Sequence, residues 1–168
     1  MDILSELGAF AFASRLKRLS DRLKSEATTI YHHQGADFND SWFLVGYMLS
    51  KFESMTVSEM AQALGISRPA ISQIAGDMVK QNLIRVRIDG SDRRRKRLSL
   101  TNKGMDAVKT LEPVWDIVGE CTEKLLASTG CDILKALSHI EAELEKQSIF
   151  SRVVNKLNNT NGAEASGV

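Results

Sequence analysis

Residues 58–104 read SEMAQALGISRPAISQIAGDMVKQNLIRVRIDGSDRRRKRLSLTNKG. Ser58 is expected to cap a short helix that ends at Gly65, because a hydroxyl can accept from first-turn N–H groups and glycine tolerates the left-handed backbone at a helix end. Ser67 is expected to cap a second helix that runs to about Asn82, with a proline in its first turn. The stretch therefore predicts two short helices joined by a glycine turn.

The apolar residues then change period from 3.6 to 2. Apolar and polar side chains alternate over residues 84–88 and again over residues 97–100. Between them lie a turn sequence at 89–92 and five consecutive basic side chains at 93–97. Alternation on both sides of a turn predicts a β-hairpin with a basic loop.

Charge is concentrated in the same stretch. Residues 66–105 hold ten basic and three acidic side chains, a net charge of +7, which leaves −6 for the rest of a chain whose formal net charge is +1. A charge run is often only a solvated face. Here two predicted strands frame it and a helix pair precedes it, which favours a surface that binds a polyanion such as nucleic acid.

The first two turns of the second helix offer side chains that can enter a DNA groove. Arg68 can read a guanine edge and Gln73 an adenine edge, while Ser67 and the helix N-terminus can hold a phosphate. At the hairpin, the residues nearest the tip are expected to reach the adjacent minor groove or its phosphates, whereas Lys96 and Arg97 are expected along the DNA backbone or the protein's own surface. The candidate DNA-binding residues are Ser67, Arg68, Pro69, Ala70, Ser72, Gln73, Arg93, Arg94 and Arg95.

Long amphipathic helices are predicted on both sides. Apolar residues recur at helical spacing over residues 3–31, and further helices are predicted from Thr101 to about Leu157, with Pro113 kinking or dividing them and Gly130 as a break. Such helices need a partner, either in the chain's own core or in a second subunit.

The helix pair and hairpin resemble the MarR family (multiple antibiotic resistance regulators). The resemblance rests on EMAQALGISRP at residues 59–69 and DGSDRRRKRLSLTNKG at residues 89–104. The second stretch is similar to the family's wing, with its Asp-Arg-Arg tip, its Leu-Ser-Leu-Thr strand and a helix opening with Lys-Gly. The resemblance covers residues 55–105, about a third of the chain.

The resemblance implies a mainly α fold: a winged helix-turn-helix lobe with a two- to three-stranded β-wing, and long N- and C-terminal dimerisation helices. We expect a single domain over residues 1–157 and a disordered tail at 158–168. The lobe is expected at about 38–101 and the dimerisation helices at about 2–34 and 102–157.

The resemblance also implies a function. Such proteins are homodimers that bind near-palindromic duplex DNA and regulate transcription, many as repressors that a small ligand releases. The alternative is a winged-helix module that binds protein and shows no salt-sensitive DNA affinity. We do not expect an enzyme, because the GxSxG, HExxH and phosphate-binding glycine motifs are missing from the sequence, and we expect no cofactor.

Four aromatic side chains are candidates for an effector pocket: Phe10, Trp42, Tyr47 and Trp115. Aromatic residues at such positions are more often plain core.

No metal site is expected, since His32, His33 and Asp37 are more typical of a solvated loop. Cys121 and Cys131 have no metal-ligand spacing and are expected to be small core residues. Two thiols, no basic leader and no long apolar run favour a cytoplasmic protein without a membrane span.

Overall fold

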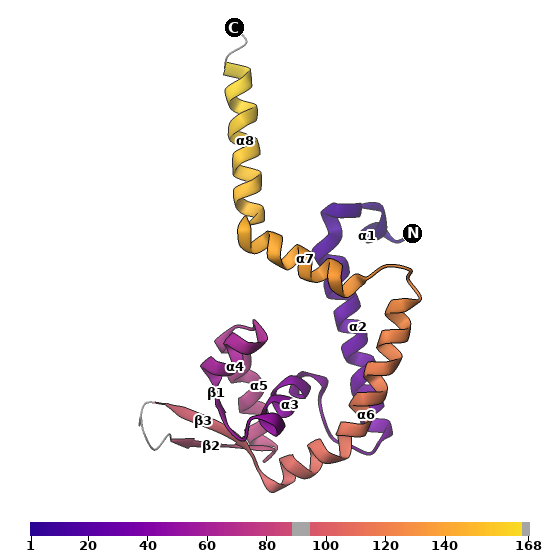
Figure 1. The fold of residues 1–168 in the computed structure, drawn as a ribbon, viewed down its shortest axis with the longest axis vertical. Coiled ribbons are helices and arrows are strands. Elements are labelled where there is room, and N and C mark those ends of the chain that lie inside the picture. Colours follow the sequence, from indigo (N-terminus) through magenta and orange to yellow (C-terminus); the bar gives the residue numbers. More distant parts are fainter. Residues whose placement is uncertain (89–94, 166–168) are drawn as a thin grey trace. The chain divides into compact units, whose positions relative to one another are not determined.

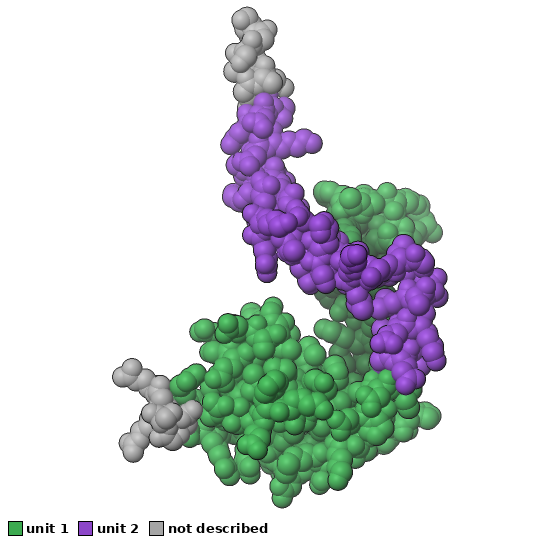
Figure 2. All heavy atoms as spheres, viewed as in Figure 1, with its two compact units in different colours: residues 1–118 green, residues 119–168 purple. Residues whose placement is uncertain are grey.

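The computed structural model describes residues 1–88 and 95–165, including the side chains of residues up to 160. The chain divides into two compact units, Met1–Val118 and Gly119–Val168, drawn in green and purple in Figure 2. The first unit contains the helix pair and the hairpin (Figure 1).

The helix pair consists of α4 (Val57–Leu64) and α5 (Arg68–Lys80). Gly65 ends α4 in the left-handed conformation with φ 63°, and the Ser67 side chain caps α5 by accepting from the Ala70 N–H, as predicted. The prediction that Ser58 caps α4 is wrong, because Thr56 occupies that position and its hydroxyl accepts from the Glu59 N–H.

The hairpin is confirmed as β2 (Ile84–Ile88) and β3 (Lys96–Leu100), and we call it the wing. A short strand, β1 (Met55–Thr56), adds to it, so the antiparallel sheet has the order β1-β3-β2. Leu98 faces Val86 on one side and Met55 on the other. The strand pairing thus connects the wing to the residues that begin α4.

The first unit also contains the N-terminal helices. They are α1 (Ile3–Glu6), the 3₁₀ turn η1 (Gly8–Ala11) and α2 (Phe12–His33), followed by η2 (Asp40–Trp42) and α3 (Phe43–Lys51). The helical pattern predicted over residues 3–31 is therefore interrupted. At Gly8 the backbone takes a φ of 54°, which an α-helix does not accommodate.

One hydrophobic core holds α3, α4, α5, the sheet and the start of α6 (Asn102–Ala127) together. All five of these elements contribute to its most deeply buried side chains, which are Val45, Met60, Ile71, Met78, Ile84 and Leu111. Helix α6 continues through Pro113, so the proline does not divide it; a division was one of the two alternatives predicted, beside a kink. Helix α5 packs its inner face into this core, so its opposite face is left at the surface.

The second unit contains the end of α6, then α7 (Ile133–Lys146) and α8 (Ile149–Ala165). The predicted single last helix is two helices, because the backbone is extended at Gln147. Helix α8 continues to Ala165 and so includes residues 158–165, which lie in the predicted disordered tail. Helix α7 buries no residue within the chain. Cys121 and Cys131 are both exposed, so the prediction of core cysteines is wrong.

Candidate nucleic-acid interface

Helix α5 separates its side chains into two faces. Ile71, Ala75 and Met78 are buried, whereas the predicted contact residues of the first two turns lie on the other face. Of these, Ser67, Arg68, Pro69, Ser72 and Gln73 are exposed and Ala70 is half-buried. This separation leaves a short, polar and accessible surface at the N-terminal end of the helix, where the backbone N–H groups and the helix dipole favour an anion.

A hollow lies beside this end of α5. Residues of α4, of the turn and of the first turn of α5 line it, together with the residue that precedes β3. They are Ser58, Glu59, Ala61, Gln62, Ile66, Ser67, Arg68 and Arg95. Arg68 and Arg95, which are far apart in the sequence, therefore share one surface. Within residues 1–88 and 95–165, the Arg68 side chain makes no hydrogen bond or ion pair, and its guanidinium is available to an external partner.

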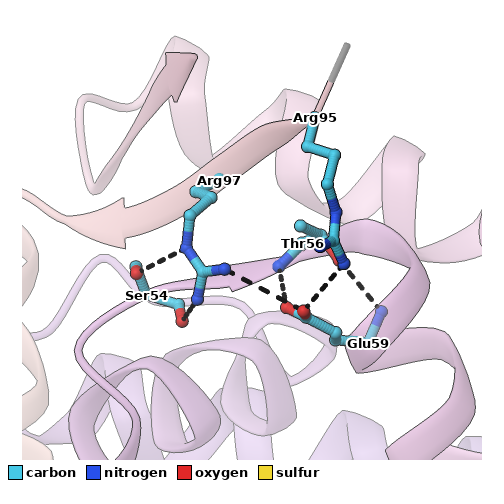
Figure 3. Close-up of polar contacts among 5 residues, drawn as sticks. All are labelled: Ser54, Thr56, Glu59, Arg95 and Arg97. Carbon is cyan, nitrogen blue, oxygen red and sulfur yellow. Dashed lines mark hydrogen bonds and ion pairs between the residues drawn. The ribbon is translucent and has the colours of Figure 1, made fainter. Parts of the chain in front are cut away.

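Where β3 begins, next to the loop of the wing, two arginines meet one carboxylate (Figure 3). Arg95 Nη2 donates to Glu59 Oε1 at 3.2 Å, and Arg97 Nη1 lies 3.9 Å from the same oxygen. Arg97 also donates from Nε to the Ser54 hydroxyl at 2.9 Å and from Nη2 to the Ser54 carbonyl at 2.6 Å. The structure thus places Arg97 on the protein's own surface, one of the two positions predicted for it.

The other oxygen of Glu59 completes a capping box. Glu59 Oε2 accepts from the Thr56 N–H at 2.8 Å, while the Thr56 hydroxyl accepts from the Glu59 N–H at 3.2 Å. Sequence reasoning missed both residues as parts of the site. The Thr-x-x-Glu spacing at residues 56–59 is the signal that could have found them.

These contacts lower the pKa of the Glu59 carboxyl. The Thr56 N–H is the largest cause and the charges of Arg97 and Arg95 add to it, while partial burial acts in the opposite direction. Since the pKa is lower in the folded chain than in the unfolded one, the stabilisation is complete above the unfolded value of about 4.3. It is lost as the pH falls through the lowered folded value.

We therefore expect a pH-dependent difference in the free energy of unfolding between the wild type and Glu59→Gln. The wild type should be more stable by a constant amount above about pH 5, and the difference should shrink as the pH falls below about 4. Urea denaturation at a series of pH values, at one protein concentration, measures it. A difference that stays the same from pH 3 to pH 7 would exclude ionised Glu59 as a stabilising group.

The rest of the wing carries exposed cations. Arg87 and Lys96 are exposed, and Arg85 is exposed with its Nε donating to the Ser99 hydroxyl at 3.1 Å. The predicted contact residues Arg93 and Arg94 lie outside the described residues.

Three of the four aromatic pocket candidates lie together. Trp115 packs against Phe43 with ring centroids 4.9 Å apart, Tyr47 lies 6.4 Å from Trp115, and Phe38 packs against both Trp42 and Trp115. Phe10 is 90% exposed and takes no part in these ring contacts.

The side chains of residues 1–88 and 95–160 include no group of three or more His, Cys, Asp or Glu that could hold a metal ion. Among the described helices, none combines the length and apolar character needed to cross a membrane.

Comparison with known proteins agrees with this geometry. The family model described as "MarR family" matches residues 36–95, which contain α3, α4, α5, β1 and β2. A relative from Bacillus subtilis, described as an uncharacterized HTH-type transcriptional regulator YwaE, is 29% identical over 109 residues. That alignment spans 64% of this chain and 62% of the relative's length.

Solved structures share the fold. The transcriptional repressor CouR bound to a 23-mer DNA duplex is 23% identical with a TM-score of 0.60, over 83% of this chain and 96% of that one. The M. tuberculosis transcriptional regulator MOSR in complex with DNA is 22% identical with a TM-score of 0.59, over 94% and 98%. The S. aureus MepR–DNA complex is 22% identical with a TM-score of 0.57, over 80% and 94%.

Proposed function

We propose that this chain is a sequence-specific DNA-binding transcriptional regulator of the MarR family, whose model matches residues 36–95, and that it acts as a homodimer. The observation that carries the proposal is the outer face of α5. Its first exposed polar side chains, Ser67 and Arg68, share one hollow with Arg95, the residue that precedes β3 of the basic wing. Such a surface suits a helix entering the major groove while the wing follows the adjacent backbone.

In this proposal each part of the interface has a separate task. Arg68 and Gln73 read base edges, and the neighbouring short side chains let the helix approach the groove closely. Ser67 and the N-terminal N–H groups of α5 hold a phosphate. Arg93 and Arg94 would extend the contact from the wing.

Unpartnered apolar side chains support the homodimer. In the N-terminal helices the exposed ones are Ile3, Leu7, Phe10, Phe12, Leu16, Leu19, Leu23 and Ile30. In the second unit they are Leu125, Leu134, Ile140, Leu144, Ile149, Phe150, Val153 and Leu157. Apolar area on this scale is seldom left in water, and a second copy of the chain could cover it.

The proposed domain division follows from these surfaces. Residues 38–101 form the DNA-binding lobe, and residues 2–34 and 102–157 supply the dimerisation helices. We further propose that the protein is a cytoplasmic repressor and that a small-molecule effector binds at the cluster of Trp42, Tyr47 and Trp115. CouR, one of the structural neighbours, is described as a transcriptional repressor.

Selection of random duplex DNA by the purified protein at physiological salt tests the function. We expect enrichment of a near-palindrome whose half-sites are about one helical turn apart. Log K should fall with log salt by about 0.9 per phosphate contact. If a folded, dimeric protein enriches no sequence and its DNA affinity does not respond to salt, the proposal fails in favour of a protein-interaction module.

A further inference from the structure

Glu59 connects the helix pair to the wing, although it belongs to neither the outer face of α5 nor the sheet. We propose that Glu59 is a positioning residue for DNA binding: its carboxylate holds Arg95 and Arg97, and with them the start of β3, against the N-terminus of α4 (Figure 3). This role rests on the proposed function, because positioning the wing matters only if the wing binds DNA.

Alternation along a strand explains why two arginines reach one acid. Side chains two residues apart lie on the same face, so Arg95 and Arg97 both extend toward α4 while Lys96 lies on the other face. Both guanidinium groups approach the same oxygen, Oε1 of Glu59. Its negative charge therefore lies against two cations that the strand places side by side.

The contacts extend beyond this ion pair. Arg97 is the more buried arginine, with a side chain 33% exposed against 51% for Arg95. It also holds the segment before β1 by donating to the hydroxyl and the carbonyl of Ser54. Glu59 in turn fixes the Thr56 N–H. The side-chain contacts therefore fasten β3 to the same residues that its strand pairing reaches, Met55 and Thr56.

The capping box alone does not require the charge of Glu59, and the charge adds the ion pairs with the two arginines. A capping box accepts glutamine as well as glutamate at this position, so hydrogen bonding to Thr56 does not require a carboxylate. A carboxylate in the same hollow as Arg68 also repels DNA phosphates. Holding Arg95 and Arg97 explains why an acid stands at this position.

The test compares Glu59→Gln with Glu53→Gln. Glu53 is exposed in the same lobe. Both variants replace a glutamate with glutamine and therefore change the net charge equally. The readout is Kd for the selected duplex as a function of salt. Glu59→Gln should bind about three- to tenfold more weakly, although the chain has lost a negative charge, and its salt slope should be shallower. Glu53→Gln should bind equally well or slightly more tightly. If Glu59→Gln binds like the control or more tightly, the proposal is overturned.

A second measurement does not depend on DNA. Amide hydrogen exchange of the free protein should be several-fold faster in Glu59→Gln at the β1–β3 pairs, Met55 with Leu98 and Thr56 with Arg97. Arg97→Gln should produce the same change, and the double variant little more. Unchanged exchange refutes the positioning role even if DNA binding weakens. A wild type that binds no DNA refutes the proposed function, while faster exchange in Glu59→Gln would still show that the carboxylate holds the strand.

Discussion

Replacing Gly104 with alanine should lower the free energy of unfolding by about 3 kcal/mol, the high end of the cost of overfilling a packed site. A Cβ at Gly104 would lie 1.9 Å from the Leu83 carbonyl oxygen, 2.9 Å from its carbonyl carbon and 3.2 Å from Leu100 Cδ2. The carbonyl cannot easily move away, because it already accepts from the Thr101 N–H at 3.0 Å. Alanine has a better helix propensity than glycine by about 1 kcal/mol. Since the steric cost is larger than this gain, the net change in the free energy of unfolding should be a loss of stability.

Gly76→Ala is the matched control for this prediction. Gly76 is also a helical glycine, but a Cβ there meets nothing within 4 Å. Its replacement should leave stability unchanged or raise it by about 0.5–1 kcal/mol. Urea denaturation of all three proteins at one fixed protein concentration measures the differences, since the stability of the proposed dimer would depend on concentration. If Gly104→Ala were as stable as the wild type, the prediction would be wrong, and α6 would be able to shift away from Leu83 without losing stability.

The helix pair and the wing could be predicted because their signals are local. A glycine that ends α4, a serine that caps α5 and the change of period after Asn82 each act within a few residues. The error at the start of α4 is equally local. Ser58 and Thr56 both carry a hydroxyl, and only the spacing from Thr56 to Glu59 identifies the residue that forms the reciprocal cap.

Contacts between distant segments could not be predicted in this way. Strand β1 has only two residues and exists because β3 pairs with it. The basic run at residues 93–97 does not reveal that Arg95 and Arg97 meet Glu59, since that depends on where the fold places α4. The close approach of Gly104 to Leu83 likewise results from the packing of α6. The Lys-Gly motif alone therefore does not reveal why a glycine is required at this position.

Replacing Arg68 with alanine should cost about 1–3 kcal/mol in binding the selected duplex, a loss of up to about 100-fold in affinity, and should relax specificity at one base pair. Arg68 is exposed in the first turn of α5 and makes no side-chain hydrogen bond or ion pair with the described residues. Its loss should therefore leave the fold intact. Titration of the selected duplex and of single-position variants measures both effects.

Two control variants separate base reading from charge. Arg68→Lys keeps the charge but loses the planar fork that pairs with two acceptors of guanine, so it should keep the salt slope and still lose discrimination. Arg22→Ala removes an equal charge from the exposed surface of α2, where Arg22 pairs with Glu26, and should change neither property appreciably. If Arg68→Ala weakens cognate and scrambled duplexes equally, Arg68 binds phosphate. Specificity would then depend on Gln73 and the short side chains of α5.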